Sequence, residues 1–103
     1  MQIDRLLNQI GFSKNEAKVY MAALESGPSS AQELAKNAGL PRTTVYSVLN
    51  YLVERGVVGK TTHQGKTRFL ADPPDKLLSI LNDLRTQVEK SLPQLEAIYN
   101  KSE

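Results

Sequence analysis

The chain has 103 residues, a net charge of +2 and no cysteine. This length suits one domain with one additional element, and the lack of cysteine excludes disulfides, thiol catalysis and thiolate metal sites. The apolar runs are too short to span a bilayer, and the N-terminus has no secretory signal pattern. We therefore expect a cytoplasmic protein with no membrane partner.

Basic residues are concentrated in the middle of the chain. Residues 36–68 contain six basic side chains and one acid, a charge of +5, whereas the rest has seven basic and ten acidic side chains. The six are Lys36, Arg42, Arg55, Lys60, Lys66 and Arg68. Such a segment indicates a polyanionic partner. The alternative is a solvated surface on which the charges are distributed by chance.

The first part of the chain is predicted to form two helices. A short helix is predicted before Gly11, because apolar residues recur there at helical spacing. These residues are Ile3, Leu6, Leu7 and Ile10. Ser13 and Glu16 have the spacing of a capping box, in which each side chain accepts from the other residue's backbone amide. A second helix then runs to Gly27-Pro28. Its predicted buried stripe consists of Ala17, Tyr20, Ala23 and Leu24.

Residues 30–56 have the pattern of a helix-turn-helix. A second capping box, Ser30 with Glu33, precedes a short helix over 31–38, and a longer helix over about 42–55 follows Gly39 and a first-turn Pro41. The positions expected to be buried are Leu34, Ala38, Leu40, Val45 and Val48. The positions expected to face outward are Arg42, Thr43, Thr44, Tyr46, Ser47 and Asn50.

The outward residue types are those that reach phosphates and base edges in a DNA major groove. Three points stay open. One of the two threonines, Thr43 or Thr44, would cap the helix. Tyr46 would either bind a phosphate or pack its ring between the helices. An ordinary helical hairpin with a polar outer face is the alternative to a DNA-binding unit.

A β-hairpin is predicted over about residues 57–71, because short β-type segments flank a polar stretch with a glycine near its tip. A hairpin directly after a helix-turn-helix is the winged-helix arrangement. Lys60, Lys66 and Arg68 are then expected to contact phosphates, and alternation along the strands would place some of them on the far side. His63 has no partner for a metal or catalytic site, so we interpret it as a solvated residue of the wing.

The C-terminal part is predicted to be a long helix after Asp72-Pro73-Pro74-Asp75, with an apolar seam and a kink or new segment near Pro93. The residues assigned to dimerisation are Leu77, Leu81, Leu84, Val88, Leu92, Leu95 and Ile98. This helix would either fold back onto its own domain or pair with a second copy. We favour pairing, because a single winged helix does not need so long an apolar helix to complete its core.

The sequence resembles the DNA-binding domain of the TrmB-like archaeal and bacterial transcription regulators. The matching stretches are GFSKNEAKVYMAAL, GPSSAQELAKNAGLPRTTVYSVLNYLVERGVV and TRFLADPP. The resemblance implies a dimeric, sequence-specific DNA-binding regulator whose recognition helix matches Pro41 to Tyr46 and Asn50. Family members usually carry a large C-terminal effector domain, whereas this sequence ends after the predicted C-terminal helix, so it is either a stand-alone short regulator or a part of a longer protein. We expect no small-molecule effector site within this chain.

These observations together predict a mainly α fold with a small β-hairpin: a winged helix-turn-helix over residues 1–72 and a coiled-coil-like dimerisation helix over 73–103. The predicted partners are double-stranded DNA and a second copy of the chain. We expect no enzyme activity, no cofactor and no metal, because the sequence has one histidine, no phosphate-binding glycine loop and no paired acids in a cleft-like motif. A winged helix that binds proteins instead of DNA is the alternative.

Overall fold

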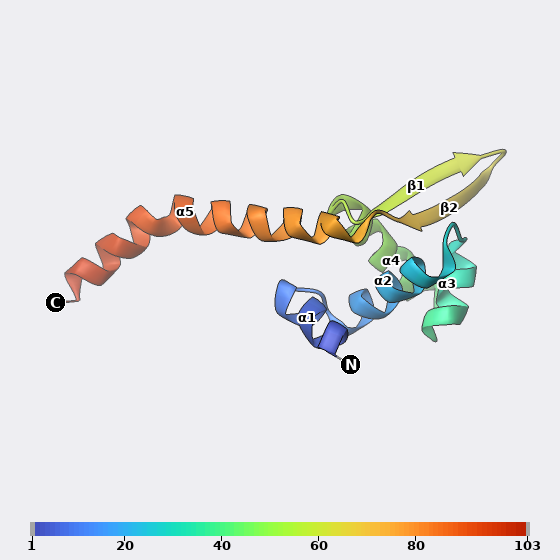
Figure 1. Cartoon of the computed structure of the whole chain (residues 1–103), viewed down its shortest axis with the longest axis horizontal. Helices are drawn as coiled ribbons and strands as arrows, with labels where there is room; N and C mark the ends of the chain where they lie inside the picture. Colours follow the sequence, from blue (N-terminus) through green and yellow to red (C-terminus); the bar gives the residue numbers. More distant parts are fainter. Residues whose placement is uncertain (1, 103) are drawn as a thin grey trace.

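The computed structural model describes residues 2–102, and its elements follow the predicted order (Figure 1). A helical body carries a two-stranded antiparallel hairpin, and a long C-terminal helix projects away from both. The elements are α1 (Gln2–Ile10), α2 (Lys14–Ser26), α3 (Ala31–Ala38), α4 (Arg42–Glu54), β1 (Val58–His63), β2 (Lys66–Ala71), a 3-10 turn (Pro74–Lys76) and α5 (Leu77–Lys101). The molecule measures 61 × 30 × 24 Å, so its outline is elongated.

Both predicted capping boxes are present. At the start of α2, the Ser13 amide donates to Glu16 Oε1 (2.7 Å) and the Glu16 amide donates to Ser13 Oγ (3.1 Å). At the start of α3, the same pair of bonds joins Ser30 and Glu33, both at 3.1 Å. Each box satisfies amides that have no partner inside the helix, and this fixes where α2 and α3 begin.

The core lies where α1, α2, α3, α4 and the base of the hairpin meet. Its largest buried side chains are Tyr20, Phe12, Phe69, Leu7, Leu34, Leu49, Leu52, Val19, Val45, Val57 and Val58. Phe12 and Tyr20 meet edge to face, with ring centroids 5.6 Å apart. The prediction that Leu24 is buried is wrong, because this residue is exposed while Ala22 and Val19 take the inward positions of α2.

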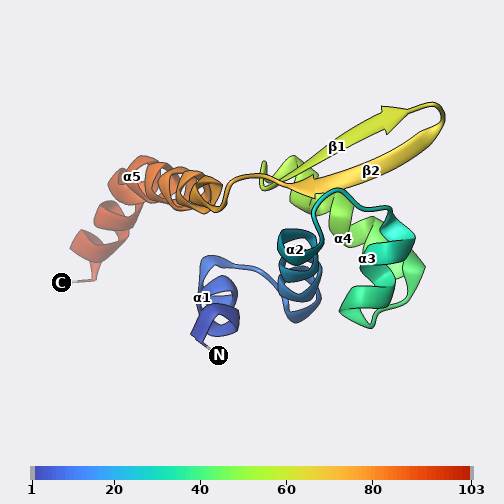
Figure 2. The same ribbon diagram turned by 45° about the vertical axis from the view of Figure 1, so that its right-hand side comes forward.

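The hairpin spans the predicted stretch, and it is joined to the helical body by a short bridge. The amide and carbonyl of Ser29 bond to the carbonyl and amide of Phe69 at 2.9 and 2.7 Å. Buried Val58 and Phe69 hold the base against the body. Beyond them the polar arms keep pairing up to a two-residue turn at Gln64-Gly65, which extends past α3 (Figure 2).

The long helix α5 begins directly after Pro73-Pro74, as predicted. Its start belongs to the core: Ile80 is buried, and Leu77, which was assigned to dimerisation, packs against the core and is half-buried. The seam residues after Ile80 are exposed. Pro93 lies inside one continuous helix, so the alternative of a new segment is wrong, whereas the C-terminal part of α5 bends away from the rest (Figure 1). A proline removes one backbone hydrogen bond and crowds the preceding turn, which accounts for the bend.

Candidate nucleic-acid interface

The turn between α3 and α4 has the geometry that the glycine predicted. Gly39 is in the left-handed conformation (φ 68°), and its amide donates to the carbonyls of Ala35 and Lys36. The Leu40 amide donates back to Ala35 at 3.0 Å. Such a turn closes α3 with its carbonyls satisfied and starts α4 at a steep angle.

The packing between α3 and α4 orients the recognition helix. Leu34 and Val45 are fully buried between them, and Ala38, Leu40 and Val48 are partly buried against the core. Sequence analysis missed Leu49 and Leu52, which α4 also buries. Because this side of α4 is held by the body, its remaining side is fixed in direction.

The outward side of α4 is polar, with one aromatic ring. Arg42, Thr43, Tyr46, Ser47 and Asn50 are exposed, as predicted. Thr44 is half-buried, which corrects its assignment to the outward set. Tyr46 lies on the outer side with 44% of its surface exposed, so its ring does not pack between the helices.

Arg42 and Tyr46 form a stacked pair on this side of α4. The Arg42 guanidinium carbon lies 5.7 Å from the centroid of the Tyr46 ring, one turn along the helix. A cation near a ring face gains roughly 0.5–1 kcal/mol at an exposed site. The contact directs the guanidinium along α4 and leaves its N–H donors available.

The start of α4 differs from the starts of α2 and α3. Within residues 2–102 no side chain caps it: Pro41 is the N-cap residue, and the first backbone bond of the helix runs from the Val45 amide to the Pro41 carbonyl (3.1 Å). The expectation that Thr43 or Thr44 caps the helix is therefore wrong. The amides of residues 42–44 point out of the helix N-terminus beside a basic side chain, an arrangement suited to an anion.

The strand register divides the basic residues of the wing between its two faces. Lys60 is opposite Phe69, Thr61 is opposite Arg68, and His63 is opposite Lys66. Side chains alternate along a strand, and directly opposed residues share a face. Lys66 and Arg68 therefore share one face with His63, whereas Lys60 lies on the other, with Phe69.

Two of the six basic residues interact with other parts of the chain. Half-buried Arg55 lies between two rings, with its guanidinium carbon 5.6 Å from the Phe12 centroid and 5.4 Å from the Tyr51 centroid, and it donates to the Tyr51 hydroxyl at 2.8 Å. Its role is structural. Arg68 lies close enough to Glu33 to influence that carboxyl: the Ser30 amide, then the Ser30 hydroxyl, and then the charge of Arg68 hold the pKa of Glu33 below its usual range.

Other kinds of site are not indicated in the described part of the chain. Residues 2–102 contain no group of three or more histidine, cysteine or acidic side chains that could hold a metal ion. No helix within this range has the length and apolarity needed to cross a membrane. The solvent-facing surface of α4 and the wing is therefore the candidate site that both the sequence and the structure indicate.

Comparison with known proteins identifies the family. Residues 6–75 match the family described as "Sugar-specific transcriptional regulator TrmB". The chain belongs to the TrmB family. Its predicted resemblance to these regulators is confirmed, as is the expectation that it is not an enzyme, because the family consists of transcription regulators.

Two curated relatives and one solved structure agree with this assignment. The chain is 31% identical over 98 residues to "Uncharacterized protein YrhO" of Bacillus subtilis, an alignment covering 95% of this chain and 34% of that protein. It is 28% identical over 100 residues to "HTH-type sugar sensing transcriptional regulator TrmBL1" of Pyrococcus furiosus, covering 97% and 29%. The chain spans about a third of the length of these two relatives.

The fold also matches that of a solved structure. The structure of TrmBL2, described as an archaeal chromatin protein with a novel mode of DNA binding, matches with a TM-score of 0.82 at 20% identity, over 97% of this chain and 39% of that one. At this identity the likeness establishes the fold. The predicted winged helix with a long C-terminal helix is confirmed.

Proposed function

We propose that this TrmB-family chain binds double-stranded DNA sequence-specifically as a homodimer and thereby regulates transcription. In this proposal α4 lies in the major groove, and the wing lies on the backbone or in the minor groove. The observation that carries the proposal is the start of α4, where uncapped amides, Arg42 and Thr43 face solvent together. A duplex phosphate would supply the acceptors that this helix end lacks.

Affinity in this proposal comes mainly from lysine and arginine contacts to phosphates, which release counterions. Lys66 and Arg68 would act from one face of the wing, and Lys60 from the other. We expect the face with Lys66 and Arg68 to contribute more, because it carries two of the three cations and His63.

Specificity would come from the outward side of α4. Arg42, Tyr46, Ser47 and Asn50 reach base edges or phosphates in the proposal, with Thr43 and half-buried Thr44 near the phosphates at the helix start. A bidentate contact of an arginine with guanine discriminates by about 1–3 kcal/mol. The stacking on Tyr46 restrains the Arg42 guanidinium on the outward side of α4.

Dimerisation is proposed to use α5. A line of large apolar side chains on α5 is not covered by any of residues 2–102, because each of its members is at least 40% exposed: Leu81, Leu84, Val88, Leu92, Leu95 and Ile98. Leu77 would contribute at the edge, because it is shared with the core. The division into a DNA-binding part (1–72) and a dimerisation part (73–103) is proposed with this role for α5.

The names of the relatives support DNA binding by a transcription regulator, but they do not support a sugar-binding site within this chain. TrmBL1 is named as a sugar-sensing regulator, and TrmBL2 is described as binding DNA. This chain spans about a third of such proteins, and the matched part contains the winged helix. We therefore propose DNA binding for this chain and no sugar site within it.

The test is binding of the full chain to labelled duplex from its own upstream region and to shuffled duplex, at two salt concentrations. We expect tight, salt-sensitive binding that prefers the upstream duplex. Failure to bind either duplex at low salt would contradict the proposal and favour the alternative of a winged helix that binds proteins.

Matched variants then test the assigned residues. Arg42→Ala should lower affinity for the preferred site by about 1–3 kcal/mol and relax the preference at one base pair; an equal loss on all duplexes would make Arg42 a phosphate contact. Lys66→Ala should reduce the salt slope by about one unit. Lys60→Ala removes the same charge from the other face and should change the slope less. The reverse order would assign the opposite face to DNA.

A further inference from the structure

The exposed apolar residues of α5 are arranged symmetrically about Val88. Leu84 and Leu92 lie four residues from it on either side, and Leu81 and Leu95 lie seven. Further out, Leu78 and Ile98 lie ten residues away, and Leu77 and Tyr99 lie eleven. All except half-buried Leu77 are exposed, so the arrangement describes the surface of the helix and not its core contacts.

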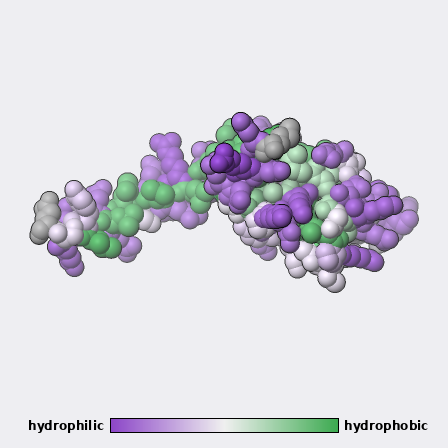
Figure 3. Space-filling model, turned by 90° about the horizontal axis from the view of Figure 1, so that it is seen from below, coloured by the Kyte–Doolittle hydropathy of each residue, from purple (hydrophilic) through white to green (hydrophobic). Residues whose placement is uncertain are grey.

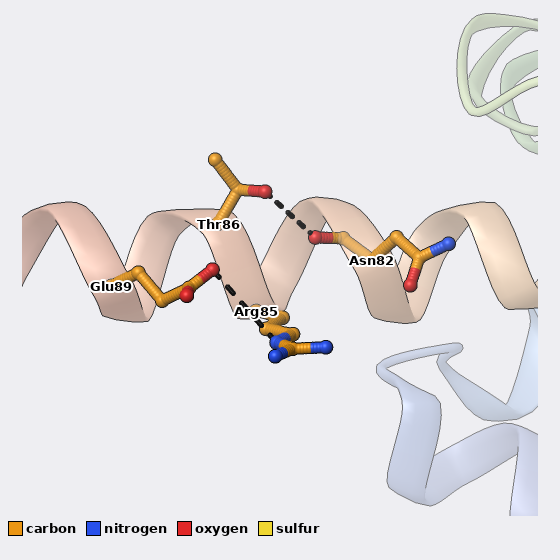
Figure 4. Close-up of polar contacts among 4 residues, drawn as sticks. All are labelled: Asn82, Arg85, Thr86 and Glu89. Atoms are coloured by element: carbon orange, nitrogen blue, oxygen red, sulfur yellow. Dashed lines mark hydrogen bonds and ion pairs between the residues drawn. The ribbon is translucent and has the colours of Figure 1, made fainter.

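The arrangement forms one continuous line on the helix. Figure 3 shows the molecule from the side on which α1 lies, and the apolar line follows α5 along most of its projecting length. The rest of the helix surface is polar: Thr86 donates to the Asn82 carbonyl (3.0 Å) and Arg85 pairs with Glu89 (3.8 Å) (Figure 4). At 3.6 residues per turn, Asn82, Thr86 and Glu89 lie away from the line through Leu84 and Val88.

We infer that two copies of α5 pair in antiparallel orientation with the symmetry axis at Val88. The inference rests on the proposed homodimer and adds its orientation and register. In an antiparallel pair, residues at equal distances on either side of the axis face each other. Leu84 then meets the partner's Leu92, Leu81 meets the partner's Leu95, and Val88 meets its own copy.

A parallel pair fits the same residues less well. In a parallel coil each core position faces its own copy, and the four-three spacing that begins at Leu81, Leu84 and Val88 continues to Ser91 and not to Leu92. Ser91 would then enter the interface while Leu92 stayed exposed. The Ser91 hydroxyl already donates to the Gln87 carbonyl of its own helix (2.8 Å), so it needs no acceptor from a partner.

Antiparallel pairing also determines where the winged parts lie. Leu77 is eleven residues from the axis, and a helix rises about 1.5 Å per residue, so the two copies of Leu77 are about 33 Å apart along the rod. The winged parts would then occupy opposite ends of the dimer. In a parallel pair they would lie side by side at one end.

Single cysteines test the inference in the full chain, because it has no cysteine of its own. A disulfide requires Cα atoms about 4.4–6.8 Å apart. Under mild oxidation we expect a covalent dimer from Val88→Cys and from the double variant Leu81→Cys/Leu95→Cys. We expect none from Leu81→Cys, Leu95→Cys or Ser91→Cys alone, since these positions meet their own copies only in a parallel pair.

Each result has a definite meaning. Efficient crosslinking of Ser91→Cys or Leu95→Cys alone would overturn the antiparallel register in favour of a parallel one. Sedimentation equilibrium of the unmodified chain separates the remaining cases. A dimer in which neither Val88→Cys nor the double variant crosslinks would overturn the inference and leave the proposed homodimer standing. A monomer at all concentrations would overturn both.

Discussion

The winged part of this chain buries its core of apolar side chains, whereas the projecting part of α5 leaves its apolar side chains exposed. Up to Ile80 most of the core is built from large apolar residues, such as Leu34 and Leu52, that neighbours in the same chain cover fully, although some, such as Leu6, remain exposed. After Ile80, residues 81–102 are exposed, including Leu84 and Leu95. Burying a leucine side chain is worth about 1.5–3 kcal/mol. The winged part thus obtains this stabilisation on its own, whereas the projecting helix requires a partner to obtain it.

The largest loss of stability is expected from a substitution in the core of the winged part. Leu34→Ala should lower the free energy of unfolding by about 2–5 kcal/mol, because it removes a fully buried side chain and leaves a cavity between α3 and α4. Urea denaturation of the full chain measures this. A loss under 1 kcal/mol would mean that the core around Leu34 is less well packed than the structure indicates.

The same substitution on the other side of the comparison is Leu95→Ala. Leu95 is 52% exposed in the single chain, so its loss should affect the monomer little and the dimer strongly. We expect the dimer dissociation constant to rise tenfold or more, because each copy loses the burial of one leucine side chain, which is worth about 1.5–3 kcal/mol. Sedimentation equilibrium measures it. An unchanged dissociation constant with a large loss of monomer stability would show that α5 folds back onto its own domain.

A smaller effect is expected from a helix cap in the winged part. Ser30→Ala removes the hydroxyl that accepts from the Glu33 amide and should lower the free energy of unfolding by about 1 kcal/mol. Ser13→Ala is the matched control at α2, because it removes the equivalent hydroxyl there and should lower the free energy of unfolding by a similar amount. A much larger loss for Ser30→Ala would show that the start of α3 also supports the hairpin through Ser29.

The pH dependence of stability tests the same capping box at the start of α3. The pKa of Glu33 is lowered in the folded chain by the Ser30 amide, the Ser30 hydroxyl and Arg68. Its contribution is therefore present above the unfolded-state pKa and is lost as pH falls through the lower folded-state value. Glu33→Gln should flatten the decline of stability on the acid side. An acid decline identical to that of the unmodified chain would assign it to other carboxylates.

The smallest expected effect is at the tip of the wing. Gln64 has φ 51°, a left-handed conformation that disfavours most side chains, at the first position of the two-residue turn. Gln64→Asn should raise the free energy of unfolding by less than the roughly 1–2 kcal/mol that left-handed backbone costs. Gln64→Ala is the control and should give no gain. Equal gains from both would indicate an effect outside the turn.

Local signals in the sequence predicted most of the fold. Ser13 with Glu16, Ser30 with Glu33, and Gly39 each determine a helix end through contacts within a few residues, so the sequence suffices to identify them. The order of helix, turn, helix and hairpin follows from these ends. The sequence left open whether the α5 seam folds back onto its own domain or stays free for a partner, and the structure shows it exposed after Ile80.

Contacts between distant residues were not predictable from local pattern. Arg55 counted as part of the basic segment, yet it stacks between Phe12 and Tyr51, and nothing in its neighbourhood in the sequence indicates Phe12. Leu24 has helical spacing but lies beyond the edge of the core. For the candidate site, the sequence identified the cations of the wing, whereas the strand register was needed to separate Lys60 from Lys66 and Arg68.

The uncapped start of α4 has a consequence for hydrogen exchange. The amides of Thr43 and Thr44 precede the first backbone bond of the helix, so in the free chain their hydrogens exchange with water at rates close to those of an unstructured peptide. At α2 and α3 the capping boxes instead protect the amides of the N-cap serine and of the glutamate three residues later. If a duplex phosphate occupies the start of α4, these two amides become slow to exchange while the rest of the helix changes little. The recognition helix is then completed at its first turn by the DNA itself.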